Sequence, residues 1–452
     1  MDSLSPPRKI SVIGLGKLGA PFAVCLAVKG YDVTAVDIDP EKVSRVNNGQ
    51  APVFEPGLEN LLPRARARLR ATLEYDEAIA DSEVTFILVP TPSDARGMFS
   101  LEHVLEACAR IGELLRYKNE FHTVVVTSTV LPGAMDNRIK PALEKSSGKR
   151  CGEKFALCYS PEFVALGSVI RDLLHPDFLL IGESEPRGGN AVLSVYRTLC
   201  ENDPPVVRLN FINAEIAKLA VNTFVTTKIA FANLLARICE RLPGADVDAV
   251  TSALSLDSRI GGKYLRGAIG YGGPCFPRDN LALAALARKL GVGATVAEAT
   301  DRANREEVTA LARLVKSRLV ESGTVGIMGM AYKAGTDVVE QSQGLLLAQS
   351  LLAGGIKVVI YDPVASANAV KLLDRPISVA PAAEQCVAAA DVVVLTTPWP
   401  EFRSLAPEIF TNNGRKKVLI DCWRLLDPTA FGRAAEYLPL GIGQGPGQRT
   451  RT

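Results

Sequence analysis

The stretch Lys9-Ile-Ser-Val-Ile-Gly14-Leu-Gly16-Lys-Leu-Gly19 decides the fold of this chain. Its apolar first half has the pattern of a buried strand, and the glycines that follow open a helical run that ends at Gly30. A second strand pattern then ends in an acid, Asp37, at the spacing of a dinucleotide-binding fingerprint. Strand, glycine turn, helix, strand and acid in this order predict a doubly wound α/β domain.

Each part of this fingerprint has a physical role toward a dinucleotide. The glycines let the backbone approach a pyrophosphate, whose negative charge suits the N-terminus of the following helix. Asp37 accepts hydrogen bonds from a ribose diol and repels a 2′-phosphate, which favours NAD over NADP. The predicted NAD contacts are Gly14, Gly16, Lys17, Leu18, Gly19 and Asp37.

Two further strand patterns extend the same sheet. Residues 83–90 end in a proline turn that carries Thr91, and residues 123–127 lead into a turn that carries Thr129. Ligands of open α/β sheets bind at the carboxyl ends of the strands, so Thr91 and Thr129 are predicted to line the nicotinamide side. Simple turn capping is the alternative role for a threonine at such a place.

From about Gly323 the chain repeats its opening theme. Residues 356–362 resemble residues 33–37, and residues 391–398 resemble residues 83–90. This alternation of strands and helices predicts a second doubly wound domain. Its glycine turn at Gly329 lacks the fingerprint, so a second dinucleotide is not implied. A pyrophosphate, a nucleoside or no ligand at all remain open there.

A long helical pattern over residues 213–241 lies between the two sheet patterns. Lys218 and Asn222 are four residues apart, so they lie one above the other on one helix face among apolar neighbours. The lysine either extends to solvent or is held as a positive charge beside a substrate. We prefer the second interpretation because of a cysteine loop further along the chain.

That loop is Gly270-Tyr-Gly-Gly-Pro-Cys275-Phe-Pro-Arg-Asp279. Gly272 allows a close backbone approach that a side chain would block, and Asp279 follows as an apolar helical run begins. An inert, buried cysteine is the alternative to a reactive thiol at Cys275. Glu162 presents a similar choice, since it lies in a loop between prolines and could be a solvated surface acid.

Composition restricts the classes of function. Hydrophobic residues make up 47% of the 452 residues and the formal net charge is +2, so we expect a globular protein whose main partner is not a nucleic acid. Nine cysteines without CxxC spacing favour free thiols in a reducing cytoplasm. The three histidines show no metal-ligand spacing, so no metal is predicted. We find no signal-peptide pattern and no apolar run of about 18 residues, so no membrane span is expected.

These patterns predict an α/β protein with two doubly wound, Rossmann-like domains joined by a long helix and a helical central domain. The predicted boundaries are residues 1–210 for the NAD domain and 211–318 for the central domain with the cysteine loop. Residues 319–440 are predicted to form the second nucleotide-type domain. The glycine-rich residues 441–452 are predicted to be a disordered tail.

Together with Val53–Leu58, Pro161–Phe163 and Gly329–Lys333, these motifs resemble the UDP-glucose/GDP-mannose dehydrogenase family over roughly residues 8 to 430. The resemblance implies an NAD-dependent, four-electron oxidation of a nucleotide sugar at C6. Such a reaction uses two NAD per turnover and yields a uronic acid. It also implies a homodimer or larger homo-oligomer that forms through the long helix.

The resemblance assigns roles to individual residues. Cys275 would attack the intermediate aldehyde as a thiolate, and a second hydride transfer would convert the thiohemiacetal into a thioester. Lys218 would stabilise oxyanions, while Asn222 and Asp279 would orient an alcohol or water. Glu162 would be the general base for hydrolysis, although the choice between Glu162 and Asp279 stays open. Thr129 would position water or cofactor.

The second domain would hold the nucleotide, with Lys333 near the pyrophosphate. The implied substrate contacts are Glu162, Phe163, Lys218, Asn222, Arg259, Tyr264, Leu265, Gly272, Cys275, Lys333 and Arg424. Lys333 counts also among the cofactor contacts. The loop with Arg259 and residues 263–265 would complete a neighbouring subunit's site.

The sequence departs from the family pattern at Leu166, Phe178 and Pro274, which affects the choice of sugar. The Pro-Glu-Phe motif resembles that of family members acting on glucose or mannose, and Gly167 favours the glucose type. UDP-glucose is therefore preferred, with TDP-glucose, GDP-mannose and UDP-N-acetylhexosamines as alternatives. A two-electron β-hydroxyacid-type dehydrogenase is a rival interpretation that would need neither Cys275 nor a second nucleotide-type domain. A non-catalytic nucleotide-sugar sensor on the same fold is a second rival.

Overall fold

A computed structural model describes residues 7–94, 97–412 and 415–443 of the chain. Contacts between residues divide it into two compact units, with the boundary between Ala220 and Val221 inside helix α9 (Phe211–Cys239). The predicted helix over residues 213–241 is thus present, shifted by two residues at each end.

The first unit is built on an eight-stranded sheet with the order β3-β2-β1-β4-β5-β6-β7-β8. All neighbours are parallel except β6 and β7, which are antiparallel. The strands are β1 (Lys9–Ile13), β2 (Asp32–Val36), β3 (Leu69–Thr72), β4 (Val84–Ile87), β5 (His122–Val126), β6 (Phe155–Tyr159), β7 (Leu179–Glu183) and β8 (Val206–Leu209). The strand order reverses between β1 and β4, and crevices at such a switch point are where ligands bind in these sheets.

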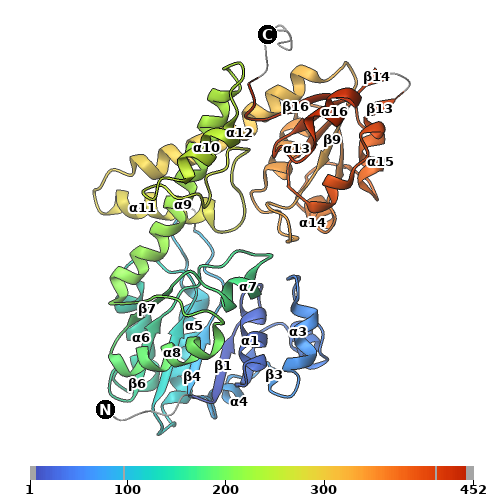
Figure 1. Cartoon of the computed structure of the whole chain (residues 1–452). Coiled ribbons are helices and arrows are strands. Elements are labelled where there is room, and N and C mark those ends of the chain that lie inside the picture. The colour runs from blue at the N-terminus through green and yellow to red at the C-terminus, as the bar shows by residue number, and fades with distance from the viewer. Residues whose placement is uncertain (1–6, 95–96, 413–414, 444–452) are drawn as a thin grey trace. The chain divides into compact units, whose positions relative to one another are not determined.

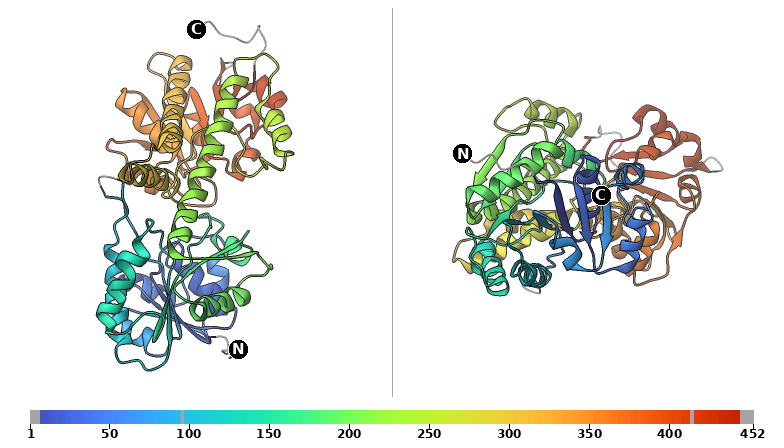
Figure 2. Two further views of the ribbon diagram at one scale, coloured as in Figure 1. Left: turned by 90° about the vertical axis from the view of Figure 1, so that its left-hand side faces the viewer. Right: turned by 90° about the horizontal axis from the view of Figure 1, so that it is seen from below.

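Helices cover both faces of this sheet (Figures 1 and 2). They are α1 (Gly19–Val28), α2 (Pro40–Asn47), α3 (Leu58–Ala65), α4 (Tyr75–Ile79), α5 (Glu102–Leu115), η1 (Met135–Ile139), α6 (Lys140–Ser147), α7 (Val169–Leu174) and α8 (Pro186–Leu199). Strands β4, β5 and β6 are buried along their whole length, as expected for parallel strands covered on both sides. Val12 packs into one core and Ile13 into the other, following the period of two along a strand.

The second unit contains a six-stranded, fully parallel sheet with the order β11-β10-β9-β12-β15-β16. Its strands are β9 (Thr324–Met328), β10 (Lys357–Tyr361), β11 (Ser378–Val379), β12 (Val392–Leu395), β15 (Val418–Asp421) and β16 (Glu436–Pro439), and β13 (Thr411–Asn412) pairs separately with β14 (Arg415–Lys416). Its helices are α10 (Val247–Ser255), α11 (Phe276–Lys289), α12 (Thr295–Arg318), α13 (Gln343–Ala353), α14 (Ser366–Lys371), α15 (Ala383–Ala388) and α16 (Pro428–Ala434), with the short helices η2 (Pro400–Ser404) and η3 (Pro407–Phe410). Two doubly wound sheets and a helical segment confirm the predicted fold class.

The start of the predicted tail is not disordered. Gly441 O accepts from Val247 N at 3.0 Å, and Gly443 N donates to Ala245 O at 2.8 Å. A Cβ on Gly441 would lie 2.4 Å from Val247 Cγ1, so glycine here permits close packing and does not mark a flexible chain. Residues 444–452 of the predicted tail lie outside the described residues.

Helix α9 is apolar enough to correct the expectation that the chain has no candidate membrane span. Over its most apolar window of 18 residues the mean hydropathy is 1.3, so within the described ranges one helix meets the length and composition needed to cross a membrane. A single helix of this kind is weak evidence for a span, because core helices meet the same criterion. About a third of that window, 33%, is buried within the chain, which leaves an apolar surface to be explained.

Candidate functional site

The glycine turn after β1 has the geometry that a dinucleotide needs. Gly14 has a φ of 105°, and a Cβ on it would lie 2.6 Å from Leu88 O. A Cβ on Gly19 would lie 1.9 Å from Gly14 O, so this glycine is needed for close packing of α1 against the turn. A Cβ on Gly16 would meet no atom within 4 Å, so this glycine faces open space. The turn is therefore rigid on its inner side and open where a pyrophosphate would approach.

Asp37 lies at the end of β2, beside this turn. Its carboxylate is buried and accepts hydrogen bonds from Leu15 N at 2.6 Å and Asp39 N at 2.9 Å, and Lys42 Nζ lies 3.5 Å away. A carboxylate has about four acceptor positions, so capacity for a ribose diol remains. The next residue, Ile38, is 90% exposed. Sequence reasoning did not single out Ile38, although an apolar residue directly after the acid was visible.

The structure joins the two turns that carry the predicted threonines. Thr91 Oγ1 donates to Thr129 O at 2.8 Å, and Ser128 Oγ donates to Val89 O at 2.6 Å. The Thr91 hydroxyl therefore holds the turn after β5 in place, which is the capping role considered as its alternative. A contact of either threonine with the nicotinamide stays a prediction.

Glu162 and Lys218 form one cluster in the first unit. Lys218 Nζ donates to Glu162 O at 2.5 Å and lies 4.5 Å from the centre of the Phe163 ring. Tyr196 donates its hydroxyl hydrogen to Glu162 Oε1 at 2.5 Å. Burial raises the pKa of Glu162 to about 7, against the lowering effects of the Tyr196 hydrogen bond and the Lys218 charge. Glu162 is thus not a solvated surface acid.

Tyr196 is a functional candidate that sequence reasoning missed. It lies on α8, where its spacing with Val192 and Val195 is that of ordinary core residues, so the sequence holds no signal for it.

Glu55, from the family motif Val53–Leu58, also helps to position Glu162. Its two oxygens accept from Gly167 N and Val169 N at 2.8 Å each, which fixes the loop that carries Glu162.

Glu215 on α9 was also missed. Its buried carboxylate accepts from Gly133 N at 2.7 Å and from Met135 N at 2.8 Å, directly after the turn that carries Thr129. It precedes Lys218 by one helical turn. The two hydrogen bonds of Glu215 fix the first turns of α9 against the loop after β5. They therefore also fix the position of Lys218.

In the second unit, Cys275 stands apart from the other cysteines. All nine cysteines are described, and Cys275 is the only exposed one. It occupies the N-cap position of α11, where the helix dipole and free backbone N–H groups favour a thiolate. Burial raises the thiol pKa of each of the others, namely Cys25, Cys108, Cys151, Cys158, Cys200, Cys239, Cys386 and Cys422.

Two further predicted residues lie at this helix. Asp279 follows Cys275 by one turn of α11 and is fully buried. Asn222 Nδ2 donates to Asp279 Oδ2 at 2.6 Å, and Arg278 Nε donates to Asp279 Oδ1 at 3.2 Å. The structure thus brings Asn222 and Asp279 together, and their role in orienting an alcohol or water stays a prediction.

The predicted substrate loop is ordered by α9. Lys228 Nζ donates to Ile260 O and Gly261 O, each at 3.0 Å. Arg259 is exposed and pairs with Asp257, two residues before it, at 2.6 Å. Tyr264, with a φ of 62°, packs its ring 6.1 Å from that of Phe276. Leu265 is buried, and its contact with a substrate stays a prediction.

Arg424 is held by hydrogen bonds within the second unit. Its guanidinium forms a bidentate pair with Asp248 at 2.7 and 2.8 Å and also donates to Leu440 O and Gly267 O. The side chain is buried, and these bonds use four of the five N–H donors of a guanidinium. A contact of Arg424 with the sugar stays a prediction. Arg424 holds the segment before the cysteine loop against the second sheet.

The second sheet also has an acid at the end of a strand, Asp362, but hydrogen bonds within the protein already use the acceptor positions of its carboxylate. Its Oδ2 accepts from Met330 N, Ala331 N and the indole Nε1 of Trp399, at 2.7, 2.9 and 3.0 Å. Its Oδ1 accepts from Val364 N and Ala365 N at 3.0 and 2.9 Å. The carboxylate has no capacity left for a ribose diol, in contrast to Asp37. Lys333 lies in the loop between β9 and α13, where it is partly buried.

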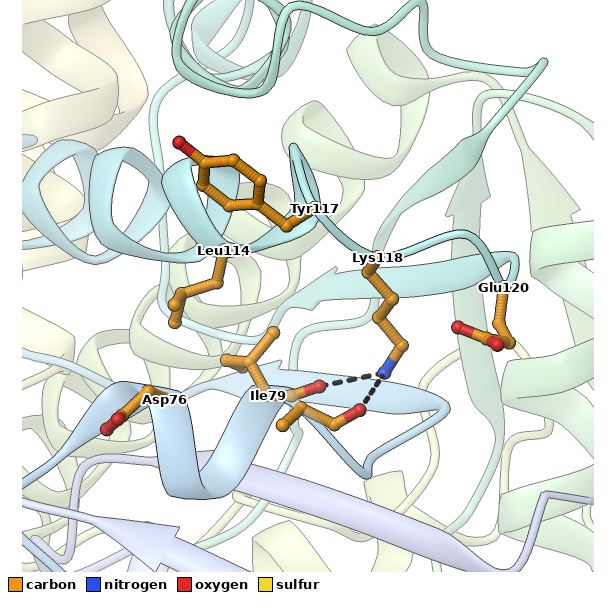
Figure 3. A pocket seen from close by; sticks show the side chains of 7 residues that line it. Asp76, Ile79, Leu114, Tyr117, Lys118 and Glu120 are labelled. Carbon is orange, nitrogen blue, oxygen red and sulfur yellow. Dashed lines mark hydrogen bonds between the residues drawn. The ribbon is translucent and has the colours of Figure 1, made fainter.

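A cavity of about 310 Å³ lies elsewhere in the first unit, as Figure 3 shows. Lys118 Nζ points to the end of α4, where it donates to Ile79 O at 2.7 Å and Ala80 O at 3.1 Å. The lining residues lie on α4 and directly after it, and at the end of α5 and directly after it, so they precede strands β4 and β5. The cavity is therefore at the amino edge of the sheet, opposite the edge where ligands bind in such folds.

Comparisons with known proteins agree with this geometry. Three domain profiles of the UDP-glucose/GDP-mannose dehydrogenase family match the chain: its NAD binding domain over residues 8–200, its central domain over 212–306 and its UDP binding domain over 326–428. The chain is 38% identical over 424 residues to a UDP-glucose 6-dehydrogenase of Haloferax volcanii, covering 92% of this chain and 97% of that protein. It is 36% identical over 358 residues to a GDP-mannose 6-dehydrogenase of Pseudomonas aeruginosa, covering 78% and 81%.

A solved structure gives the same result. The UDP-glucose dehydrogenase of Pyrobaculum islandicum superposes with a TM-score of 0.88 at 32% identity, covering 98% of this chain and 99% of that one. The fold and the glycine turn thus define an NAD-dependent dehydrogenase of the nucleotide-sugar class. The chain belongs to the UDP-glucose/GDP-mannose dehydrogenase family.

Proposed function

We propose that this protein oxidises the C6 alcohol of UDP-glucose to the uronic acid, with two NAD consumed per turnover. The observation that carries this proposal is Cys275, the single exposed thiol of nine, placed at the N-terminus of α11 with Asp279 one turn behind it. A four-electron oxidation needs a nucleophile that holds the aldehyde for its second oxidation, and a two-electron dehydrogenase does not. The reaction would take place in the cytoplasm, where such a thiol stays reduced.

The first glycine turn fits NAD. The open surface at Gly16 would receive the pyrophosphate, Asp37 the adenosine ribose and Ile38 one face of the adenine. NAD, when bound, accepts hydride at its nicotinamide ring. Lys17 adds a positive charge at the turn, beside the pyrophosphate.

In the first oxidation, the C6 alcohol loses a hydride and a proton and becomes an aldehyde. We assign Asn222 and Asp279 to orient the alcohol, since their side chains are already hydrogen-bonded to each other at 2.6 Å. Lys218 would stabilise the developing oxyanion, because its ammonium is held on Glu162 O and the Phe163 ring.

In the second oxidation, the Cys275 thiolate adds to the aldehyde carbon to form a thiohemiacetal. Loss of a second hydride converts this adduct into a thioester. Water then attacks the thioester, and Glu162 takes a proton from that water. The sum is one alcohol, two NAD and one water converted into one carboxylate, two NADH and three protons. A pKa near 7 makes Glu162 a suitable base at neutral pH.

The choice of sugar nucleotide rests on resemblance and similarity. Gly167 and the similarity to UDP-glucose dehydrogenases favour UDP-glucose. GDP-mannose is the second candidate, because a GDP-mannose dehydrogenase is similar over 78% of this chain. TDP-glucose differs from UDP-glucose by one methyl group, which an apolar pocket distinguishes by only ~1–3 kcal/mol.

A substrate panel tests this proposal. With UDP-glucose we expect two NADH per sugar consumed, and a kcat/KM above those with TDP-glucose, GDP-mannose and UDP-N-acetylhexosamines. Absorbance at the NADH band and chromatography of the sugar product give both quantities. One NADH per sugar would refute the four-electron reaction in favour of a two-electron dehydrogenase. No NADH with any of the sugars would favour a non-catalytic sensor.

We also propose that α9 forms a homodimer interface. One face of α9 carries a stripe of exposed, large apolar side chains at helical spacing, namely Phe224, Phe231, Leu234 and Ile238. A stripe of large apolar side chains on one helix is a surface that a second copy of the same helix would cover.

Charge on this stripe should separate the subunits. The double change Phe231→Glu with Leu234→Glu is expected to shift the mass in light scattering toward the 48.3 kDa of one chain, because each buried carboxylate would lose hydration in the dimer. Leu256→Glu is the matched control, since Leu256 is an exposed leucine outside α9. An unchanged oligomer in the double variant would contradict the proposed interface.

A further inference from the structure

The loop that leads to Cys275 is held from outside by buried amides. Asn304 on α12 accepts from Tyr271 N at 2.7 Å and donates to Tyr271 O at 3.0 Å. Gln343, the first residue of α13, donates its Nε2 hydrogen to the same Tyr271 O at 3.3 Å. Both backbone polar groups of Tyr271, four residues before the thiol, are therefore held by side-chain amides.

The glycines of this loop allow its close seating on the loop between β9 and α13, residues 330–343. Gly273 N donates to Glu340 O at 2.8 Å. A Cβ on Gly272 would lie 2.3 Å from Gln341 O, and a Cβ on Gly273 would lie 2.7 Å from the Tyr332 ring. These contacts are backbone against backbone and backbone against ring, so a shift of one loop moves the other.

The loop over residues 330–343 is itself tied together. Tyr332 N donates to Val338 O at 3.0 Å, and Ser342 Oγ donates to Met330 O at 2.6 Å. The same loop carries Lys333, which under the proposed function lies at the nucleotide pyrophosphate. A nucleotide that shifts Lys333 would therefore shift the cysteine loop with it.

Gln343 is hard to explain by stability alone. Its side chain is 5% exposed, and its Oε1 has no hydrogen-bond partner among the described residues. A buried acceptor without a partner destabilises a fold, and an apolar side chain of similar size would avoid that cost. The Gln343 amide does provide a hydrogen bond to the Tyr271 carbonyl, which limits the movement of that carbonyl.

We propose that Gln343 and Tyr332 are positioning residues for Cys275, and that residues 330–343 couple nucleotide binding to the placement of the thiol. This inference rests on the proposed thioester reaction. The first hydride transfer, from alcohol to aldehyde, does not use the thiol, whereas the second does. A displaced thiol should therefore slow only the second oxidation and let aldehyde escape.

Gln343→Leu tests this selectivity. We expect the number of NADH formed per sugar consumed to fall from two toward one, with the aldehyde trapped by semicarbazide, since a misplacement near 1 Å slows a step by ~10²-fold. The rate of Cys275 alkylation by iodoacetamide in the nucleotide-free protein should change as well. Gln349→Leu is the matched control: Gln349 lies on the same helix and donates to Leu372 O at the same 3.3 Å, outside the cysteine loop. It should keep a ratio of two.

A second pair of variants separates position from folding. Tyr332→Ala removes the ring that seats Gly273 and should also lower the ratio, whereas Tyr332→Phe keeps the ring and should restore it. Thermal unfolding of each variant reports whether the fold is intact. A ratio of two in folded Gln343→Leu and Tyr332→Ala, with both oxidations slowed equally, would overturn the inference.

The variant Cys275→Ala distinguishes failure of the inference from failure of the proposed function. If this variant yields aldehyde but no acid while Gln343→Leu behaves as wild type, only the coupling is wrong. If Cys275→Ala still forms the acid, the thioester reaction itself is wrong, and the coupling proposal is overturned with it.

Discussion

Cys275→Ser is expected to abolish formation of the uronic acid while NAD still binds. A serine hydroxyl is a far weaker nucleophile than a thiolate at a helix N-terminus, so we expect kcat to fall by at least ~10³-fold. Steady-state NADH formation measures the loss, and titration calorimetry with NAD measures binding. The glycine turn that would receive NAD lies in the first unit and is untouched by the substitution.

Cys151→Ser provides the control for this substitution. Cys151 is only partly buried, but burial raises the pKa of its thiol, and it has no place in the proposed reaction. We expect that variant to turn over at the wild-type rate. Iodoacetamide should label Cys275 first among the nine cysteines. Unchanged turnover in Cys275→Ser would refute the thioester scheme.

Glu162→Gln is expected to arrest the reaction after both oxidations. Without a base to activate water, the thioester should persist, so a burst of two NADH per active site should precede turnover that is ~10²–10⁴-fold slower. Intact-mass spectrometry should then show the acyl group on the protein. If Asp279→Asn accumulates the acyl form and Glu162→Gln does not, Asp279 is the hydrolytic base.

The pKa of Glu162 also predicts how the reaction depends on pH. A base must be deprotonated, so in the wild type thioester hydrolysis should slow as the pH falls through about 7. The Tyr196 hydroxyl lowers the pKa of Glu162 by its hydrogen bond, so Tyr196→Phe should move this transition to higher pH. A transition at the same pH in both proteins would contradict the assignment.

The stability of the protein should change with pH in a related way. The pKa of Glu162 is raised from 4.5 to about 7 on folding, so this group favours the folded state while protonated and loses that effect as the pH rises from 4.5 through about 7. Glu162→Gln should therefore raise the free energy of unfolding above pH 7, by up to about 3 kcal/mol. Urea unfolding at pH 5.5 and pH 8 measures the difference.

The sequence predicted the features that depend on short stretches of chain. The dinucleotide fingerprint has fixed spacing because one strand, one turn and one helix must together contact a pyrophosphate. Its residues here are Gly14, Gly16, Gly19 and Asp37. The second sheet was predicted in the same way, from apolar strand patterns that repeat those of the first. Cys275 was predicted from the resemblance and from a glycine-rich loop before a helix, and the structure adds that it is the only exposed cysteine.

Other features depend on residues far apart in the chain, and local patterns do not reveal them. Arg424 pairs with Asp248, and 176 residues separate the two, so no spacing along the chain predicted this pair. The tail from Gly441 was predicted to be disordered because glycine is flexible, whereas the structure uses Gly441 for close packing on Val247.

The class of fold, the NAD site and the candidate nucleophile could be predicted from the chain alone, because they follow from local periodicity and from residue types at fixed spacing. The chemical state of Glu162 required the folded structure, since its pKa depends on burial and on Tyr196 and Lys218, which lie elsewhere in the chain. The hold of Gln343 on the peptide before Cys275 likewise became visible only there. Burial and hydrogen bonding between distant segments are three-dimensional properties, and no spacing along the chain encodes them.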